Sequence, residues 1–552
     1  MCGIFGVISK NKNKDEDLFI QKDQLNLESN KIQKRGPDDN QFVMLPSTPN
    51  FQVALGFHRL AINDLSSDGN QPMYLNNCYL ICNGEIYNFK QLCDQHQFEY
   101  KSKSDCEIIL HMYLKLGMED TIKQLDGYFA FILVDQQKDI VYVGRDPFGV
   151  RPLFLGRDKV LQQYFLASEL KSIHQLAKNV DQFPPGSYLE ISGDQENLVS
   201  YYHCNKFLTT QFHQNEEQIC QQINQLFTHA VKKRLMSDRP IGCLLSGGLD
   251  SSLVSALVAR EFKKNKTGTI NTFSIGMTGS TDLYFAQKVA DHIGSIHHHI
   301  ELTPDDFLKA IPEVIYHIES YDTTTVRASV GNYLVGKYIK EKTDCVVIYN
   351  GDGSDEQSGY LYLRKAPSVE EFQAECVNLL TEIHMFDVLR SDRSISSNWS
   401  LESRTPFLDI DFVNYYMSID PQLKMYGPDR MEKYLLRKAF SGENLLPNEV
   451  LWRPKEAFSD GCSSPENSWH TIIQKFVDPL VSRQDLLDAP KKYPHNTPVL
   501  KESYYYRKIF ESYYPNRELV IKHFWLPKWC GNQADPSARA LDLYTEQQKQ
   551  KK

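Results

Sequence analysis

The chain has 552 residues, of which 41% are hydrophobic and 24% are charged, and its formal net charge at pH 7 is -9. This length predicts two to four domains, and the composition is that of a globular protein, which excludes a fibrous or fully disordered chain. The negative charge provides no general attraction for nucleic acid or acidic membranes, so an anionic substrate requires local positive groups.

The apolar runs and the cysteines indicate in which cellular compartment the protein is found. The longest apolar runs, such as residues 128–134, are too short to span a bilayer, and no signal peptide precedes them. Twelve cysteines are scattered without CxxC pairs or zinc-type spacing, as expected for reduced thiols. We therefore expect a cytosolic protein with small-molecule substrates and neither a membrane nor a nucleic-acid partner.

The first part of the chain, residues 1–206, is rich in short β-type runs. Ser104 and Glu107 have the spacing of a capping box before a helix at residues 108–116. The mixture predicts an α+β domain of layered β-sheets with flanking helices. Its clearest strands are residues 79–82, 129–134, 140–143, 153–155 and 188–191.

A polar, irregular stretch at residues 207–217 predicts a domain junction. Beyond it, in residues 218–545, strand and helix patterns alternate, which predicts an α/β domain with a doubly wound parallel sheet and a helical C-terminal part. Residues 546–552 form a polar tail. The predicted strands are residues 241–245, 269–275, 298–300 and 344–349, and the predicted helices are 282–293, 304–317 and 326–340.

The glycine loop after residue 245 is the clearest chemical signal in the second part. Gly247 and Gly248 allow the backbone to approach an anion, and the free N–H groups of the next helix point toward it. Ser246 and Ser251 add hydroxyl donors, and Asp250 is able to hold a divalent cation. The loop lacks the lysine of GxxxxGK[ST], which argues against an ordinary kinase or GTPase, although a plain strand-to-helix turn has similar composition. Because ligands bind at the carboxyl ends of parallel strands, this loop and a second one, residues 350–356, are expected to line one cleft.

Cys2 has a second possible role beyond that of an ordinary thiol. Removal of Met1 would leave Cys2 with a free α-amino group beside its own thiol, so that one residue supplies both nucleophile and base. A cysteine at this position alone is weak evidence for catalysis. Its context strengthens the case, because six segments in order resemble the class II glutamine amidotransferase domain, which has the N-terminal nucleophile fold. They are Cys2-Gly3-Ile4-Phe5-Gly6, Arg35-Gly36-Pro37-Asp38, His58-Arg59-Leu60, Asn83-Gly84-Glu85-Ile86-Tyr87-Asn88, Ser104-Asp105 and Arg145-Asp146-Pro147-Phe148-Gly149.

This resemblance implies that Cys2 attacks the side-chain amide of glutamine while Asn83 and the Gly84 N–H hold the oxyanion. Arg59 would bind the α-carboxylate of glutamine, and Glu85 with Asp105 its α-ammonium group. The remaining glutamine-binding residues implied are Leu60, Ala61, Ile62 and Asn63.

The second part, and with it nearly the whole chain, resembles the glutamine-hydrolysing asparagine synthetases of eukaryotes, whose first loop is of the ATP pyrophosphatase type. The implied reaction converts aspartate and MgATP to β-aspartyl adenylate, which ammonia then converts to asparagine and AMP. The segments that carry the likeness are residues 246–252, 272–276, 321–327, 351–356, 404–409, 452–458 and 536–539.

By the same resemblance, Asp250 and Asp355 hold Mg²⁺, the implied cofactor, and Lys455 neutralises charge on the phosphates. Aspartate or pyrophosphate would be anchored by Thr324, Thr325, Arg327 and Ser354. The ATP-binding residues implied are Leu245, Ser246, Gly247, Gly248, Asp250, Ser251, Ile275, Asn350 and Gly351. A homodimer and a closed passage for ammonia are also implied.

The chain departs from the family at the second loop, which usually reads Ser-Gly-Glu-Gly-Ser-Asp-Glu. Here it begins with Asn350, and Asp352 takes the place of the glutamate associated with forming and using the adenylate. A displacement of about 1 Å in a reacting group costs on the order of a hundredfold in rate, so we expect reduced but present synthetase activity.

Two other functions remain open from the sequence. One is an amidotransferase that uses a different carboxylate acceptor, and the other is a catalytically impaired regulator that binds glutamine or ATP. The run His297-His298-His299 does not favour a metal site, because adjacent strand residues face opposite ways.

Overall fold

The computed structural model describes residues 1–10, 21–209, 212, 215–427, 430–531, 533–537 and 539. The chain divides into two compact units. Unit 1 comprises Met1–His203, Met236–Arg239 and Ser396–Glu402, and unit 2 comprises the remainder. The sequence placed the junction at residues 207–217, whereas unit 2 begins at Cys204, and two later segments return to unit 1. The predicted tail, residues 546–552, lies outside the described residues.

Unit 1 contains two six-stranded sheets whose paired strands are antiparallel. The first has the order β10-β8-β9-β1-β3-β2 and the second the order β12-β11-β7-β6-β5-β4. The first sheet consists of β1 (Gly3–Lys10), β2 (Asp39–Met44), β3 (Phe51–Arg59), β8 (Phe154–Asp158), β9 (Gln163–Ala167) and β10 (Asn179–Gln182). The second consists of β4 (Met73–Leu75), β5 (Cys78–Ile86), β6 (Gly127–Asp135), β7 (Ile140–Arg145), β11 (Ser187–Ser192) and β12 (Gln195–Ser200).

The two sheets face each other across one hydrophobic core. Ile4 and Leu55 from the first sheet share this core with Ile81, Ile132 and Val143 from the second. The outer face of the second sheet packs on helices α2 (Phe89–His96), α3 (Ile108–Leu116) and α4 (Met118–Gln124). Helix α1 (Lys22–Asn30) contacts β2 and β3 of the first sheet. This arrangement confirms the predicted layered α+β domain.

The predicted capping box before α3 is wrong. The Ser104 side chain makes no cap hydrogen bond, and Asp105–Glu107 form a 3-10 turn ahead of the helix. Glu107 instead accepts the N–H groups of Lys101 and Ser102, at 2.8 Å each. The Glu107 side chain, which the local pattern assigned to the helix end, therefore hydrogen-bonds to the preceding loop.

Unit 2 is built on a five-stranded sheet with the order β15-β14-β13-β16-β17. The strands are β13 (Ile241–Leu244), β14 (Asn271–Gly276), β15 (Ile296–Glu301), β16 (Val347–Tyr349) and β17 (Glu402–Arg404), and the first four pair in parallel. The crossover helices are α6 (Leu249–Asn265), α7 (Thr281–Ile293) and α9 (Thr323–Lys342). Because crossovers are right-handed, α6 and α7 cover one face of the sheet and the returning α9 covers the other. The expected doubly wound parallel sheet is thus confirmed.

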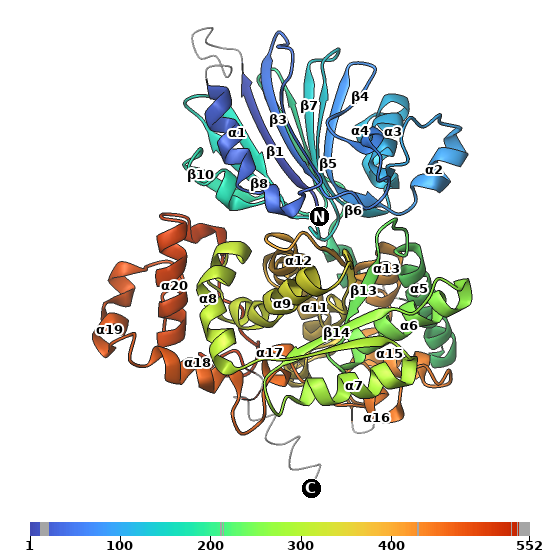
Figure 1. Ribbon diagram of the computed structural model, residues 1–552, viewed down its shortest axis with the longest axis vertical. Helices are drawn as coiled ribbons and strands as arrows, with labels where there is room; N and C mark the ends of the chain where they lie inside the picture. Colours follow the sequence, from blue (N-terminus) through green and yellow to red (C-terminus); the bar gives the residue numbers. More distant parts are fainter. Residues whose placement is uncertain are drawn as a thin grey trace. The chain divides into compact units, whose positions relative to one another are not determined.

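The C-terminal part of unit 2 is largely helical, as predicted. Helices α18 (Trp469–Val477) and α20 (Lys501–Tyr513) pack against α8 (Pro304–Ile318), and α19 (Arg483–Lys492) packs on α20 (Figure 1). Within the described ranges, no helix has both the length and the apolar character needed to cross a membrane.

Candidate active sites

The first site surrounds Cys2 in unit 1. Strand β1 pairs with β3 so that Gly3 lies opposite His58, which places Leu60, just beyond β3, next to Cys2. The Leu60 N–H donates to Cys2 Sγ at 3.4 Å, and the thiol donates to the Leu60 carbonyl at 3.7 Å. Burial raises the pKa of the Cys2 thiol. A thiol in this environment needs a nearby base to become a nucleophile.

Asn83 and Gly84 lie on the buried part of β5. The side chain of Asn83 is fully buried, and within the described residues neither its oxygen nor its nitrogen has a hydrogen-bond partner. Buried amides are nearly always hydrogen-bonded, so this one is suited to receive a ligand. A side chain at Gly84 would put its Cβ 2.4 Å from the Tyr128 carbonyl oxygen, so this position requires glycine.

The predicted glutamine-binding residues form two groups around the segment from Leu60 to Asn63. Asn63 Nδ2 donates to Glu85 Oε2 at 2.5 Å and to Asp105 Oδ1 at 3.0 Å, which brings both carboxylates together. Burial raises the pKa of Asp105 to about 6. Two acidic groups joined in this way are able to bind an ammonium group.

The segment itself is held by hydrogen bonds at each residue. The Ala61 N–H donates to Asp38 at 2.8 Å, and the Ile62 carbonyl accepts the Asp238 N–H at 2.9 Å. The Arg59 guanidinium, by contrast, bonds to the Ser66 carbonyl, to Asn70 and to the Asp64 carbonyl. In this structure Arg59 therefore holds the loop that follows Asn63. A substrate carboxylate would have to share the Arg59 guanidinium with this loop.

The second site lies where the two glycine loops of unit 2 meet. Gly247 has a φ of +71°, and Ser246 and Ser251 join across the first loop with their hydroxyls 3.0 Å apart. A Cβ at Gly351 would lie 2.7 Å from the Ser251 nitrogen, so the second loop packs directly on the start of α6. This close approach is possible only because Gly351 has no side chain.

Both loops line one large cavity, as the strand order predicts. Its empty volume of about 1190 Å³ includes space that is open to solvent. Among the predicted residues that line it are Leu245, Ser246, Gly248, Asp250, Ser251, Ile275, Asn350, Gly351, Asp352, Asp355 and Lys455. Gly247 and Ser354 support this wall from behind, since Gly247 packs against Phe285 and Ala286 and the Ser354 hydroxyl donates to Asp250 at 2.8 Å.

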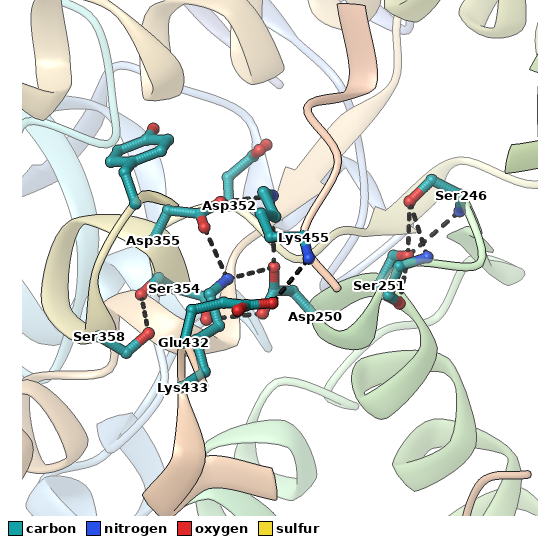
Figure 2. A network of polar contacts seen from close by, with 12 residues as sticks. Ser246, Asp250, Ser251, Asp352, Ser354, Asp355, Ser358, Glu432, Lys433 and Lys455 are labelled. Carbon is teal, nitrogen blue, oxygen red and sulfur yellow. Dashed lines mark hydrogen bonds and ion pairs between the residues drawn. The ribbon is translucent and has the colours of Figure 1, made fainter. Parts of the chain in front are cut away.

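The centre of the large cavity is a cluster of two aspartates and two lysines (Figure 2). Lys433 Nζ lies 2.6 Å from Asp250 Oδ2 and 2.7 Å from Asp355 Oδ1. Lys455 Nζ lies 2.7 Å from Asp355 Oδ2 and 3.7 Å from Asp250 Oδ2. Burial acts against the charge of Asp355, but the two lysines outweigh it and lower its pKa to about 2. Asp355 therefore remains ionised at neutral pH.

Asp352 lies in a separate group of buried charges at the edge of the large cavity. Arg390 Nη2 donates to Asp352 Oδ1 at 2.7 Å, and Arg390 Nη1 lies 3.0 Å from Asp387 Oδ1. The Tyr360 hydroxyl donates to Glu356 Oε1 at 2.7 Å. Burial raises the pKa of Asp352, while Arg390 opposes that shift.

A smaller side cavity shares a wall with the large one. Thr324 and Thr325 line it together with Trp525 and Pro536, and Arg390, Asp387 and Lys455 line both cavities. Arg327, which the resemblance implies as an anchor for aspartate or pyrophosphate, lines neither cavity. Its guanidinium is buried against Glu502 and Asp535, with Arg327 Nη2 2.5 Å from Glu502 Oε2.

Sequence reasoning missed Lys433 and Arg390. Lys433 has a φ of +59° and stands 183 residues after Asp250, so no local motif marks it. Arg390 occupies helix α12 (Asp387–Ser396), where an arginine is ordinary. The histidines of β15 have structural partners, since His297 hydrogen-bonds to Thr272 and Ser274 at 2.9 and 3.0 Å.

Two family models match the chain. The glutamine amidotransferase domain matches residues 1–227, and asparagine synthase matches residues 222–375 and 364–533. The asparagine synthetase [glutamine-hydrolyzing] of Homo sapiens is 44% identical over 575 residues, which cover 99% of each chain. The chain belongs to the glutamine-hydrolysing asparagine synthetase family.

Other family members give similar values over the same share of the chain. The Rattus norvegicus protein is 45% identical over 575 residues, and the Gallus gallus protein is 46% identical over 576 residues, again covering 99% of both chains. The similarity therefore extends over both units and includes both candidate sites.

Proposed function

We propose that this chain makes L-asparagine from L-aspartate, using ATP and ammonia released from L-glutamine, through a β-aspartyl-AMP intermediate. The observation that carries the proposal is the charge cluster between the two glycine loops. Asp250, Asp355, Lys433 and Lys455 meet there in one cavity, next to donors suited to phosphate. Membership of the asparagine synthetase family specifies the acceptor as aspartate.

Asp250 and Asp355 fit a magnesium ion that accompanies ATP. Both carboxylates lie within 2.7 Å of the single nitrogen of Lys433, so they converge on one point where a cation already sits. Mg²⁺ binds through one or two carboxylates together with water and substrate phosphates. Mg²⁺ bound here would neutralise the β- and γ-phosphates and orient the α-phosphate.

The adenylation step uses residues that line the large cavity. The N–H groups of the first loop and the Ser246 and Ser251 hydroxyls bind the pyrophosphate part of ATP. An oxygen of the aspartate β-carboxylate bonds to the α-phosphorus while the bond to pyrophosphate breaks. Lys455 and Lys433 stabilise the negative charge that develops on pyrophosphate.

The amide-forming step takes place at the wall between the two cavities. Lys455 lines both cavities, Asp352 lines the large one, and Thr324 and Thr325 line the side cavity, where they would bind aspartate. Ammonia attacks the β-carbonyl carbon, the bond from this carbon to the AMP oxygen breaks, and the Asp352 carboxylate accepts the proton that the nitrogen loses. The hydrogen bond from Arg390 fixes the Asp352 carboxylate, and this offsets part of the loss of rate expected from a side chain one methylene shorter than glutamate.

Unit 1 supplies the ammonia. Cys2, with its amino group freed by loss of Met1, attacks the glutamine amide, and Asn83 and the Gly84 N–H hold the oxyanion. Glu85 and Asp105 bind the α-ammonium group of glutamine. The buried Asn83 amide, which has no hydrogen-bond partner among the described residues, supports this assignment.

The test is AMP formation by the purified chain with its processed Cys2 terminus. The reaction contains MgATP and ammonium, with aspartate or with no acceptor. Aspartate-dependent AMP with an equal amount of asparagine is the expected result. Glutamine hydrolysis without AMP would contradict it and would favour another carboxylate acceptor or an inactive synthetase unit.

The location and assembly of the protein also belong to the proposal. All twelve cysteines are free thiols in the structure, which supports a reducing compartment, the cytosol. We propose a homodimer from the family likeness, with small-molecule substrates and neither nucleic-acid nor membrane partners. Light scattering after size-exclusion chromatography measures the assembly directly.

A further inference from the structure

The loop that carries Lys455 has little regular structure of its own. It runs from Arg453 to Ala457, between α16 (Asn448–Leu451) and α17 (Phe458–Gly461), and all five of these residues line the large cavity. The Lys455 N–H donates to a side chain, Glu432 Oε1, at 2.6 Å. Side-chain contacts from other parts of unit 2 therefore decide where this loop lies.

Glu456 is the residue through which most of these contacts act. Its Oε2 accepts the Thr281 hydroxyl at 2.7 Å and Arg453 Nη2 at 3.1 Å. Its Oε1 accepts Arg539 Nη2 at 2.7 Å. Both carboxylate oxygens of Glu456 therefore accept hydrogen bonds, and the donor to Oε1 is Arg539.

Arg539 reaches beyond Glu456 to the segment that follows α17. Its Nη1 donates to the Ser464 carbonyl at 2.9 Å, and its Nη2 donates to the Ser463 carbonyl at 3.2 Å. The Arg539 side chain is only 5% exposed. One guanidinium thereby joins the loop before α17 to the segment after it, which requires the planar fork of arginine.

Asp535 and Ser537 are anchored independently of Arg539. Asp535 forms an ion pair with Arg327 at 2.7 Å and accepts Gln474 Nε2 at 2.9 Å. The Ser537 hydroxyl donates to Asp460 Oδ1 at 2.8 Å, and Pro536 lines the side cavity. The segment therefore contacts both the helical part of unit 2 and the wall of the reaction centre.

We propose that Asp535, Ser537 and Arg539 form a C-terminal strap that fixes the Lys455 loop, with Arg539 as a positioning residue for the synthetase reaction. The strap acts on Lys455 through Glu456, and its three residues line neither cavity. The catalytic part of this inference rests on the proposed role of Lys455. It also gives Arg327 a function different from substrate binding, since Arg327 holds the strap through Asp535.

The kinetic test uses the full chain and measures ammonium-dependent AMP formation. Arg539→Gln is expected to lower kcat tenfold to a hundredfold, with the KM for aspartate changed less than twofold, because Lys455 is misplaced by a fraction of an ångström to 1 Å. Glutamine hydrolysis without ATP stays at the wild-type rate. Arg539→Lys is expected to recover part of kcat, since it keeps the charge that faces Glu456 and loses the fork.

A double-mutant cycle tests whether Arg539 acts through Glu456. If the two residues act as one pair, Arg539→Gln combined with Glu456→Gln loses no more activity than the more damaging single variant. Losses that multiply would overturn the proposed route. Wild-type kcat in Arg539→Gln would overturn the positioning role itself.

Hydrogen exchange separates positioning from general loss of stability. In Arg539→Gln, amides of residues 453–464 are expected to exchange faster while the sheet of unit 2 is unchanged. Arg507→Gln is the matched control, since Arg507 is also buried in the C-terminal part but lines neither cavity. It should leave the exchange of residues 453–464 unaltered. Faster exchange throughout unit 2 in Arg539→Gln would contradict the strap, and this result can be read even if the wild-type chain makes no AMP.

Discussion

The Nζ atom of Lys455 lies 2.7 Å from Oδ2 of Asp355 in the cavity that both glycine loops line. Burial disfavours the charge of each group, yet their mutual attraction keeps both ionised, since it lowers the pKa of Asp355 and raises that of Lys455. The lysine proposed to bind phosphate and the aspartate proposed to bind Mg²⁺ are therefore paired with each other. Binding of MgATP would exchange this contact for two others, Asp355 with Mg²⁺ and Lys455 with phosphate.

Lys433 provides the sharpest test of this charge cluster. Lys433→Met leaves Asp250 and Asp355 with a single lysine between them, so ammonium-dependent AMP formation is expected to fall on the order of a hundredfold or more. Glutamine hydrolysis should remain at the wild-type rate. The matched control is Lys438→Met, since Lys438 is a 43% exposed lysine paired with Glu216. A surface pair contributes about 0–1 kcal/mol, so this control should keep full activity. Full activity in Lys433→Met would show that Lys455 suffices.

Asp352→Glu tests the effect of the shorter side chain in the second loop. The added methylene moves the carboxylate toward the reacting atoms, so kcat for synthesis is expected to rise, while Asp352→Asn should abolish most of it. In both variants, a small shift of the side chain is enough to keep a hydrogen bond from Arg390. An unchanged rate for Asp352→Glu would mean that the loop already places Asp352 correctly.

Asn83→Ala tests the oxyanion site in unit 1. Removal of the amide deletes one donor to the developing charge, and such a loss lowers kcat by about 10²–10³. Glutamine hydrolysis should fall by this factor with little change in KM. Ammonium-dependent synthesis by the same variant is the internal control and should equal that of the wild type. A large rise in KM with unchanged kcat would instead assign Asn83 to ground-state binding.

Glutamine binding is expected to depend on pH through Asp105. Burial raises the pKa of this carboxyl to about 6, so it loses its charge as the pH falls through that value and no longer attracts the α-ammonium group. The Kd of glutamine for the non-hydrolysing variant Cys2→Ala, measured by calorimetry, should be constant above pH 7. Below pH 6 it should rise about tenfold for each pH unit, because one proton competes with one ligand. Asp105→Asn should bind weakly at every pH, whereas a flat profile in Cys2→Ala itself would exclude Asp105 as the titrating group.

Removal of Mg²⁺ should separate the two reactions. Chelation with EDTA is expected to stop AMP formation, because the carboxylates of Asp250 and Asp355 would then repel the phosphates without a metal ion between them. Added Mg²⁺ should restore AMP formation. Glutamine hydrolysis in unit 1 should continue throughout. Persistence of AMP formation without any divalent cation would contradict the assignment of the two aspartates.

The sequence by itself determined the features that depend on neighbouring residues. Alternating strand and helix patterns predicted the parallel sheet of unit 2, and short β-type runs predicted the layered sheets of unit 1. The glycines at 247, 248 and 351 marked the loops, because a close backbone approach requires the absence of a side chain. Parallel strands end at one edge of a sheet, so even the meeting of the two loops could be predicted.

Only the tertiary structure decided which distant charges meet. Lys433 faces Asp250 across 183 residues of sequence, and Arg390 holds Asp352 from a helix that no motif distinguishes. The same applies to the wrong prediction before α3, since Glu107 bonds to Lys101 and Ser102 in place of capping a helix, and to Arg327, which pairs with Glu502. A local pattern reports backbone conformation and one buried face, whereas the partner of a buried charge is set by whichever chain segment packs against it.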